Sequence, residues 1–342
     1  MSEYILEVTN LRKYFSARRT LGQILTGKRR WIRAVDGVSF RIKRGEIFGL
    51  IGESGCGKTT TGKLVMKLLE PTGGQMLVDG SDVTHLDKKQ LIGHKKKVQM
   101  IFQDPYASMN PRFRIKQVLM EPLTIHRLGA DAQARGEMAA KALSEVKLIP
   151  PQEYIERYPH MLSGGQRQRV ATARTLILSP SLIVADEPVS MVDLSTRAEL
   201  LQMMKEVQQD LNLTYLYITH DLSTARYFTD RIAVMYLGKI VEMGNSDEII
   251  DHALHPYTKA LICAVCEPES GRVDTIKCLP IKGEIPSAAN IPAGCRFHPR
   301  CLYARPECSE QDEPELQEAS PGHFVACGRY LDVPKEEAGI LG

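Results

Sequence analysis

One stretch of the chain places glycines, a lysine and a threonine at the spacing of a phosphate-binding loop. Residues 52–59 read Gly-Glu-Ser-Gly-Cys-Gly-Lys-Thr, follow the apolar run Ile47–Ile51 and precede a segment with helical spacing. Glycines let backbone N–H groups wrap closely around a phosphate, and the start of a helix adds the positive end of its dipole. The sequence therefore predicts a site for the phosphates of a nucleotide.

Two side chains of this loop have specific expected tasks. The Lys58 ammonium reaches the β- and γ-phosphate oxygens, and the Thr59 hydroxyl faces Mg²⁺. Cys56 is interpreted as a small residue that fits the loop. The residues expected to contact the nucleotide here are Gly52, Ser54, Gly55, Cys56, Gly57, Lys58, Thr59 and Thr60.

An acidic pair follows a second apolar strand. Leu182–Ala185 leads directly into Asp186 and Glu187, at the carboxyl edge of a parallel sheet where the phosphate-binding loop also lies. One carboxylate can hold Mg²⁺ and the other can polarise a water molecule. Because phosphoanhydride hydrolysis depends on positioning and charge neutralisation, this pair indicates a hydrolytic centre beside the loop.

Four further motifs carry a family resemblance. Residues 162–166 read Leu-Ser-Gly-Gly-Gln, which resembles the signature sequence of the ATP-binding cassette (ABC) family. The family's other motifs follow its usual order: Gln103 after the strand Val98–Phe102, the D-loop Ser190–Asp193, and His220 after Thr214–Thr219. The similarity spans residues 4 to about 265. It implies an α/β P-loop NTPase fold of the ABC ATPase type, with a mixed sheet and an inserted helical subdomain.

The resemblance implies roles for the hydrolytic residues. Glu187 would be the general base, while His220 would contact the γ-phosphate and steady the attacking water. Gln103 would sense Mg²⁺ and connect to a membrane partner, and Thr59 and Asp186 would hold the Mg²⁺ ion.

The signature also has a direct physical reading. Ser163 precedes an expected helix, Gln166–Leu178, so its hydroxyl and the nearby N–H groups predict a second anion-binding helix start. In the family, the signature of one subunit caps the γ-phosphate held by the other subunit. The residues assigned to this shared nucleotide contact are Ser163, Gly164, Gly165, Gln166 and Asp193.

Two positions leave a choice or depart from the family. Tyr14 is the expected adenine-stacking aromatic, and Phe15 is its rival. The D-loop has Met191 and Val192 where the family more often has Ala and Leu. This exchange is apolar and tolerant in volume, and Asp193 is retained, so we expect function to survive.

Four cysteines lie in a polar, proline-rich segment near the end of the chain: Cys295, Cys301, Cys308 and Cys327. Four thiolates suit tetrahedral Zn²⁺ or an iron–sulfur cluster, and either would supply folding energy that the segment lacks. Their spacings match neither the zinc-ribbon nor the ferredoxin pattern. The residues alone therefore leave zinc, iron–sulfur and four unligated thiols open.

The same region resembles one ABC subfamily. Gly283–Ser287, Gly294–Cys301 and His255–Thr258, with the basic insertion after Tyr14, are similar to the oligopeptide/dipeptide importer ATPases. In that subfamily the four cysteines hold a [4Fe-4S] cluster, so the resemblance favours a structural cluster over zinc. His298 would then support the cluster from outside its set of ligands.

These residues must be positioned by a larger framework. Expected strands are Ile5–Val8, Val38–Ile42, Ile47–Ile51, Gln75–Val78, Val98–Phe102, Leu182–Ala185, Thr214–Thr219 and Arg231–Met235, with a helix from Gly57 to about Leu69. Strands alternating with helices predict a mainly parallel sheet covered on both faces. We expect an ABC ATPase domain over 1–266, with a helical subdomain at about 104–180, and a C-terminal extension over 267–342 without sustained periodicity.

Composition limits the class of protein. The 342 residues are 25% charged and 43% hydrophobic, and 44 basic against 41 acidic residues give a formal charge of +3. This charge does not demand nucleic acid as a partner. No run approaches a membrane helix and no signal sequence is recognised, so we expect a cytoplasmic chain. The basic segment 12–33 is either a solvated loop or an amphipathic turn that touches phosphate or lipid head groups.

The resemblance implies a transport function. We expect an ATP-hydrolysing ABC importer subunit for oligopeptides or dipeptides, peripheral on the cytoplasmic face of the cell membrane. Its partners would be a second ABC ATPase, two transmembrane permeases and, indirectly, an extracytoplasmic solute-binding protein. Alternatives are an importer ATPase for oligosaccharides or metal complexes, or a soluble ABC ATPase acting on DNA or ribosomes. The single P-loop and the lack of a heptad run disfavour the last reading, and a P-loop kinase would have no use for the signature.

Overall fold

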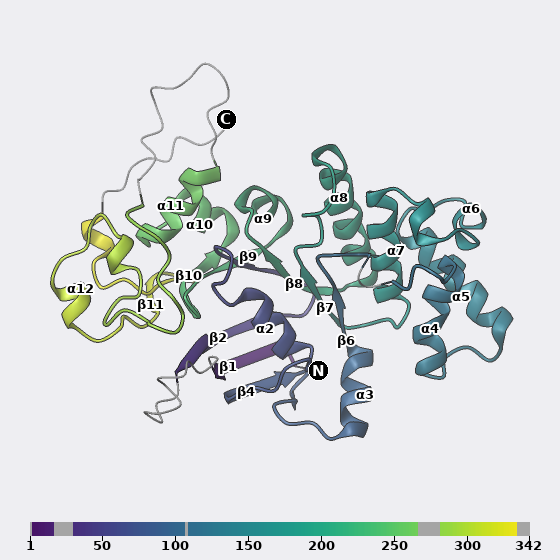
Figure 1. Cartoon of the computed structure of the whole chain (residues 1–342), viewed down its shortest axis with the longest axis horizontal. Coiled ribbons are helices and arrows are strands. Elements are labelled where there is room, and N and C mark those ends of the chain that lie inside the picture. Colours follow the sequence, from purple (N-terminus) through teal and green to yellow (C-terminus); the bar gives the residue numbers. More distant parts are fainter. Residues whose placement is uncertain (1, 17–29, 107–108, 266–280, 334–342) are drawn as a thin grey trace, which may run out of the picture.

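The computed structural model describes residues 2–16, 30–106, 109–265 and 281–333 (Figure 1). The strands are β1 (Tyr4–Ser16), β2 (Trp31–Lys43), β3 (Ile47–Ile51), β4 (Gly73–Val78), β5 (Ser81–Asp82), β6 (Val98–Ile101), β7 (Leu182–Asp186), β8 (Thr214–Thr219), β9 (Arg231–Tyr236), β10 (Lys239–Asn245), β11 (Gln317–Ser320) and β12 (His323–Val325). The helices are α2 (Lys58–Val65), α3 (Lys88–Lys97), α4 (Ile115–Ile125), α5 (Ala132–Glu145), α6 (Gln152–Ile155), α7 (Gly164–Leu176), α8 (Leu194–Leu211), α9 (Leu222–Phe228), α10 (Ser246–Asp251), α11 (Pro256–Val265) and α12 (Glu307–Glu310).

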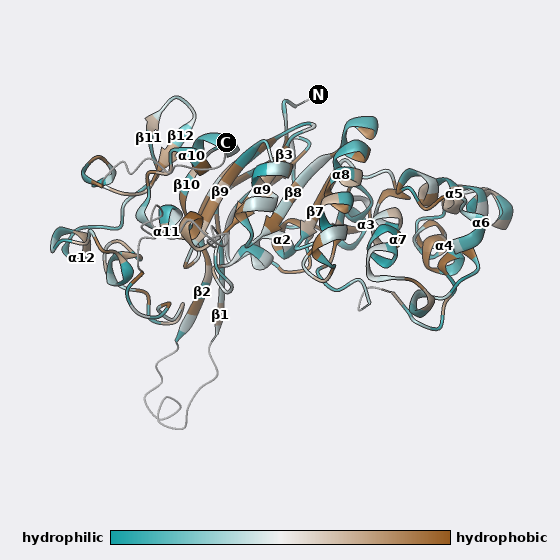
Figure 2. Ribbon diagram, turned by 90° about the horizontal axis from the view of Figure 1, so that it is seen from above, coloured by the Kyte–Doolittle hydropathy of each residue, from teal (hydrophilic) through white to brown (hydrophobic). Residues whose placement is uncertain are grey.

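The larger sheet has the strand order β11-β12-β10-β9-β3-β8-β7-β6. Strands β9, β3, β8, β7 and β6 pair in parallel, whereas β10, β12 and β11 pair antiparallel. Every residue of β3, β7 and β8 is buried, as expected for apolar strands covered on both faces. Figure 2 shows hydrophobic residues concentrated on these central strands. The mixed sheet is confirmed, and it is parallel only in this core.

A second, antiparallel sheet has the order β2-β1-β4-β5. The predicted strand Gln75–Val78 is found as part of β4, but it pairs antiparallel with β1 and lies outside the parallel sheet. Strands β1 and β2 are each 13 residues long, well beyond the predicted apolar runs. At their outer ends, residues 12–16 and 31–34 include no buried residue, so pairing between the two strands holds them together there, and hydrophobic periodicity does not reveal this pairing.

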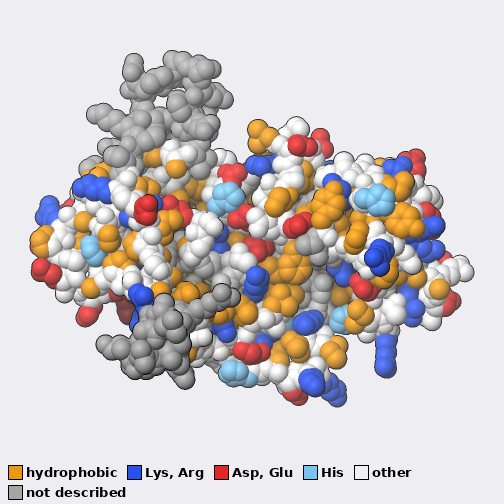
Figure 3. Space-filling model, viewed as in Figure 1, with side chains coloured by type: hydrophobic (Ala, Val, Ile, Leu, Met, Phe, Trp, Pro, Cys, Tyr) orange, Lys and Arg blue, Asp and Glu red, His pale blue; other side chains and the backbone are white. Residues whose placement is uncertain are grey.

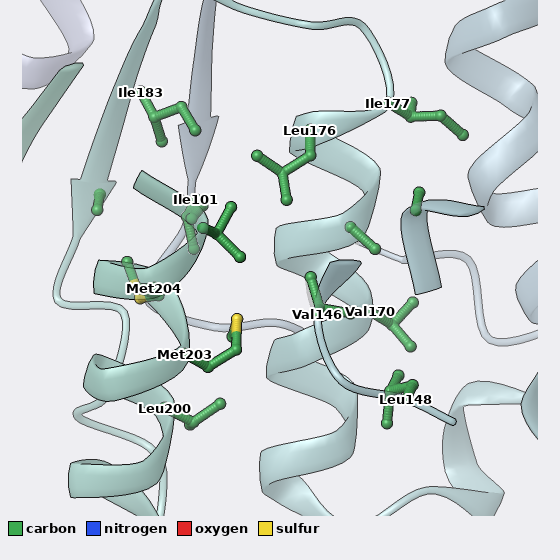
Figure 4. Close-up of a cluster of buried hydrophobic side chains, with 14 of the residues drawn as sticks. Ile101, Val146, Leu148, Val170, Leu176, Ile177, Ile183, Leu200, Met203 and Met204 are labelled. Carbon is green, nitrogen blue, oxygen red and sulfur yellow. The ribbon is translucent and has the colours of Figure 1, made fainter. Parts of the chain in front are cut away.

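Helices α4–α7 lie between β6 and β7 in sequence and form a group at the right of Figure 1. Buried side chains connect this group to the sheet, as Figure 4 shows for Val170 and Leu176 of α7, Met203 of α8, and Ile183 of β7. The expectation of a helical segment between Phe102 and Leu182 thus agrees with the observed elements. Within the described ranges, no helix is long and apolar enough to cross a membrane.

The C-terminal segment, for which the sequence predicted no sustained periodicity, contains short helices and strands. Residues 281–333 contain α12, the short strands β11 and β12, and 3₁₀ turns at His298–Arg300 and Tyr330–Asp332. Strand β12 pairs with β10 and so extends the main sheet. Phe297 is 3% exposed and packs on the rings of Tyr236 and Tyr257. These elements are too short for a periodic pattern, which explains why the sequence did not predict them.

Candidate active site

The phosphate-binding loop is built as its sequence requires. It connects the buried strand β3 to α2, and Gly52 and Gly57 have φ angles of 151° and 114°. A Cβ on Gly52 would lie 2.2 Å from the carbonyl oxygen of Met235, and one on Gly57 would lie 2.1 Å from that of Ala34. Only glycine fits at either position. Helix α2 ends at Val65 rather than near Leu69, because Lys67 adopts a left-handed conformation with φ 54°.

Lys58 points into this loop. Its side-chain Nζ donates to the carbonyl oxygens of Gly52 at 2.6 Å and Glu53 at 3.0 Å, and the residue is 5% exposed. Ser54 and Gly55 form the exposed crest above it, while Cys56 is buried and its pKa is raised by burial. In the part of the chain that the structure describes, no carboxylate forms an ion pair with Lys58. The loop therefore presents a positive charge without a protein counter-ion.

Thr59 and Asp186 face each other beside the loop. The Thr59 hydroxyl donates to Oδ1 of Asp186 at 3.1 Å. Asp186 ends β7 and is 5% exposed, and burial raises the pKa of its carboxyl group although the bond from Thr59 opposes the shift. A hydroxyl and a largely desolvated carboxylate are oxygen ligands that suit Mg²⁺.

Glu187 joins two other predicted residues. Its Oε2 accepts a hydrogen bond from Gln103 Nε2 at 2.9 Å, and its Oε1 lies 3.0 Å from His220 Nδ1. These residues follow the neighbouring strands β7, β6 and β8, which explains their convergence at one sheet edge. Glu187 has a φ of 47°, an uncommon backbone conformation for a residue with a side chain.

The signature residues lie at the start of α7, in a different part of the chain from the phosphate-binding loop. Ser163 caps α7: its Oγ accepts from the N–H of Gln166 at 3.2 Å, and Gln166 Oε1 accepts from the N–H of Ser163 at 3.0 Å. A Cβ on Gly165 would lie 2.6 Å from the Thr196 side chain, so the signature packs against the start of α8. Asp193, in the D-loop, is the residue before that helix. Helix α7 begins two residues before the predicted start.

Tyr14 differs from Phe15 in how it is held. The Tyr14 hydroxyl donates to Asp36, and the Arg33 guanidinium lies 5.7 Å from the centre of its ring. Phe15 is 37% exposed and has Lys13 over its ring. Burial raises the pKa of Asp36, but hydrogen bonds from Tyr14 and Arg296 outweigh burial and lower it below its usual value. The Tyr14 ring is therefore oriented by a buried carboxylate.

The four predicted cysteine ligands are neighbours. Burial raises the pKa of Cys295 to about 12, and Cys327, Cys301 and Cys308 add to the effect. Three of the sulfurs accept a hydrogen bond from the backbone N–H two residues later, which is Phe297 for Cys295, Tyr303 for Cys301 and Arg329 for Cys327. Such bonds suit metal-bound thiolates. Among the described residues, however, no three His, Cys, Asp or Glu side chains converge closely enough to hold a metal ion. The metal site stays a prediction.

Comparison with known proteins identifies the family. A family model described as "ABC transporter" matches residues 35–190, and one described as "Oligopeptide/dipeptide transporter, C-terminal region" matches residues 241–308. The chain is 46% identical over 331 residues to "Oligopeptide transport ATP-binding protein AppF" of Bacillus subtilis, covering 96% of this chain and 98% of the relative. The chain belongs to the ABC transporter family. Within it, this ABC protein is an ATP-binding subunit of the oligopeptide/dipeptide transporter type and an ATPase.

Two further comparisons agree with this assignment. The ABC protein is 41% identical over 324 residues to "Dipeptide transport ATP-binding protein DppF" of Haemophilus influenzae, covering 94% of this chain and 96% of the relative. It also resembles the solved structure of the ATP-binding cassette MJ0796, described as a dimer in a post-hydrolysis state bound to ADP and Pi. That likeness has a TM-score of 0.61 at 27% identity and covers 70% of this chain and 98% of the other. The P-loop ABC ATPase fold is thereby confirmed.

Sequence reasoning missed a set of charged residues around the loop. Asp36, Glu53, Arg296 and Arg300 lie beside the predicted nucleotide residues, and both arginines come from the C-terminal extension. The available signal was their position: each arginine is adjacent to one of the cysteines in the segment 295–301. Only the fold reveals that this segment reaches the loop.

Proposed function

We propose that this chain powers the uptake of oligopeptides or dipeptides by hydrolysing ATP for two membrane permeases. The observation that carries the proposal is the joint arrangement of Lys58 in its loop and Glu187 between Gln103 and His220. The peptide cargo is supported by the names of the relatives and by the family match over residues 241–308. Oligosaccharides or metal complexes are the alternative cargo.

The loop residues would hold the phosphates. Backbone N–H groups of residues 52–60 and the Lys58 ammonium would contact the β- and γ-phosphates, and the buried location of Lys58 would strengthen this attraction. Thr59 and Asp186, with Gln103, would hold Mg²⁺. When bound, Mg²⁺ neutralises the charge that develops on the phosphate oxygens. Tyr14 would stack on the adenine, because Asp36 fixes the orientation of its ring.

Glu187 would act as the general base on water. Its two oxygens are held by Gln103 and His220, and because each carboxylate oxygen can accept a second hydrogen bond, a water can still donate to the carboxylate. His220 is 59% exposed at its side chain and can turn toward the γ-phosphate while it still orients Glu187. Positioning of this kind, together with electrostatic stabilisation, supplies almost all of the catalysis in phosphoryl transfer.

A second ABC ATPase, identical or different, would complete each site. The signature Ser163–Gln166 packs on the start of α8 next to the D-loop, so both can belong to one surface that faces the partner's nucleotide. The relative described as a dimer with ADP and Pi supports such a pair. Asp193 would lie at the contact between the two subunits.

The location follows from the partners. We place the protein at the cytoplasmic face of the cell membrane, bound to two permeases that receive cargo from an extracytoplasmic solute-binding protein. Nucleic acid is not a proposed partner: acidic and basic side chains are interspersed over the face drawn in Figure 3, and the formal charge is +3. The described ABC ATPase elements would form one domain over 1–266, including the helical subdomain at about 104–180, and 267–342 would form the extension.

We also propose that the four cysteines hold a [4Fe-4S] cluster with a structural role, with zinc as the alternative. Four neighbouring thiols and the backbone N–H groups aimed at three of them support a thiolate site. The thiols would have to draw closer to share a metal.

The function can be tested by fractionation. The tagged chain, expressed in cells that carry the neighbouring transport genes, should sediment with membranes and co-purify with permeases. Its ATP hydrolysis in that complex should increase when peptide-loaded solute-binding protein is added. Sedimentation with ribosomes or nucleic acid, and no co-purified permease, would contradict the proposal.

A further inference from the structure

The cysteine-bearing segment makes a direct contact with the phosphate-binding loop. Arg300, adjacent to Cys301, donates from Nη1 and Nη2 to the two carboxylate oxygens of Glu53, at 2.7 and 3.0 Å. The two side chains are 7% and 24% exposed. A bidentate pair of this kind fixes direction as well as distance. It joins the extension to the second residue of the loop.

Glu53 in turn determines how Lys58 is held. Its carbonyl oxygen is one of the two that accept from the Lys58 ammonium, and its N–H donates to the buried hydroxyl oxygen of Tyr257 at 2.9 Å. Arg300, Tyr257 and Lys58 therefore fix one residue at its side chain, its N–H and its carbonyl. A shift of the Glu53 backbone would move the ammonium that faces the phosphates.

A parallel contact reaches the expected adenine end of the site. Arg296, adjacent to Cys295, donates to Oδ2 of Asp36 at 2.6 Å and to the carbonyl oxygen of Leu237. The other oxygen of Asp36 accepts from the Tyr14 hydroxyl. The segment 295–301 of the extension thus contacts Glu53, which holds Lys58, and Asp36, which holds the Tyr14 ring.

Attachment of the extension alone does not account for this arrangement. The pairing of β12 with β10 and the packing of Phe297 on Tyr236 and Tyr257 already anchor the segment. A residue that only anchored the extension could pair with any nearby carboxylate, whereas Arg300 pairs with one inside the loop.

We propose that Arg300 is a positioning residue that acts on ATP affinity through Glu53. This inference rests on the proposed function of residues 52–59 as the ATP phosphate site. Nucleotide affinity would then depend on whether the segment 295–301 is folded.

The test compares full-length variants by ATP Kd, KM, kcat and melting temperature. Arg300→Met should raise Kd and KM by about threefold or more and change kcat much less, because only the pre-formed loop is disturbed. Arg226→Met is the matched control: Arg226 makes a bidentate pair with Asp251, at 2.9 and 3.0 Å, away from the loop. The control should lower the melting temperature at most and leave Kd and KM unchanged.

A double-mutant cycle tests whether Arg300 acts through Glu53. Glu53→Gln should shift Kd in the same direction, and Arg300→Met with Glu53→Gln should be no worse than the poorer single variant. Additive losses would overturn the proposed route. A lowered melting temperature with wild-type Kd and KM in Arg300→Met would overturn the proposal altogether, and if that variant does not fold, an unchanged Kd in Glu53→Gln would do so.

Failure of this inference can be separated from failure of the proposed function. If Lys58→Ala loses ATP affinity in the same assay and Arg300→Met does not, only the positioning role is rejected. If Lys58→Ala keeps its affinity, the phosphate site itself is misassigned.

Discussion

Glu187 and His220 stand at the ends of the adjacent parallel strands β7 and β8, with 3.0 Å between carboxylate Oε1 and imidazole Nδ1. On the opposite side, the Gln103 amide donates to the second carboxylate oxygen. Both oxygens are thus engaged, and the unusual φ of 47° places the carboxylate between its two partners. Such strain at a reactive residue persists only where the surroundings enforce it.

Replacing Glu187 by Gln should abolish turnover and retain ATP binding. The amide keeps the shape of the side chain but cannot accept a proton, and a general base contributes about 10²- to 10⁴-fold to the rate. The variant should accumulate as an ATP-bound closed dimer, which gel filtration detects as a larger species. Normal hydrolysis in Glu187→Gln would remove this residue from the role of base.

Asp186→Asn should stabilise the nucleotide-free protein at neutral pH. Burial raises the pKa of Asp186, so between its ordinary value and its folded value the folded chain binds more protons than the unfolded chain. Stability of the wild type therefore falls as pH rises through that window, and the loss persists at pH 7. Asparagine has no charge to desolvate.

The measurement is a thermal melt of both proteins across pH, with no nucleotide or metal. The advantage of Asp186→Asn should be present at about pH 7 and should shrink toward about pH 4, where an ordinary aspartate takes up its proton. Mg²⁺-dependent ATP hydrolysis should be lost in the variant. A lower melting temperature than the wild type at neutral pH would contradict the assigned burial cost.

The residues that sequence predicted well share a local cause. Gly52, Gly57 and Lys58 belong to one strand–loop–helix unit, and short-range geometry dictates their types. Glu187 was singled out by its place after an apolar strand, and the ABC family resemblance added His220; the structure brings both to one sheet edge. These inferences needed local motifs and a family resemblance, and no detail of packing.

The parts that sequence missed depend on contacts across long separations. Arg300 and Glu53 are 247 positions apart, and nothing in the composition of either segment indicates their pairing. The outer ends of β1 and β2, residues 12–16 and 31–34, include no buried residue, so a pattern of buried residues could not mark them. Likewise, β12 is three residues long and is defined by its pairing with β10.

If the four cysteines hold the proposed [4Fe-4S] cluster, Cys301→Ser should remove it and loosen the extension. A serine oxygen is a weak ligand for iron, so the anaerobically purified wild type should be brown and the variant colourless. Limited proteolysis should cut residues 281–333 faster, because the ligated group supplies folding energy to that segment. Cys263→Ser, on α11, is the control and should retain colour and resistance. A colourless wild type that contains zinc would decide for the other metal.

Lys58→Ala should eliminate ATP binding without preventing assembly with the partner subunits. Lys58 is 5% exposed, and in the described structure its ammonium donates to two carbonyl oxygens and to the Cys56 sulfur but to no carboxylate, so its charge is available to an anion. Removing a buried cation that lacks a carboxylate partner relieves a desolvation cost, and the variant should therefore remain folded. Nucleotide titration should show the loss, while co-purification with permeases and the melting temperature stay close to wild type. ATP affinity equal to that of the wild type would show that another group attracts the phosphates.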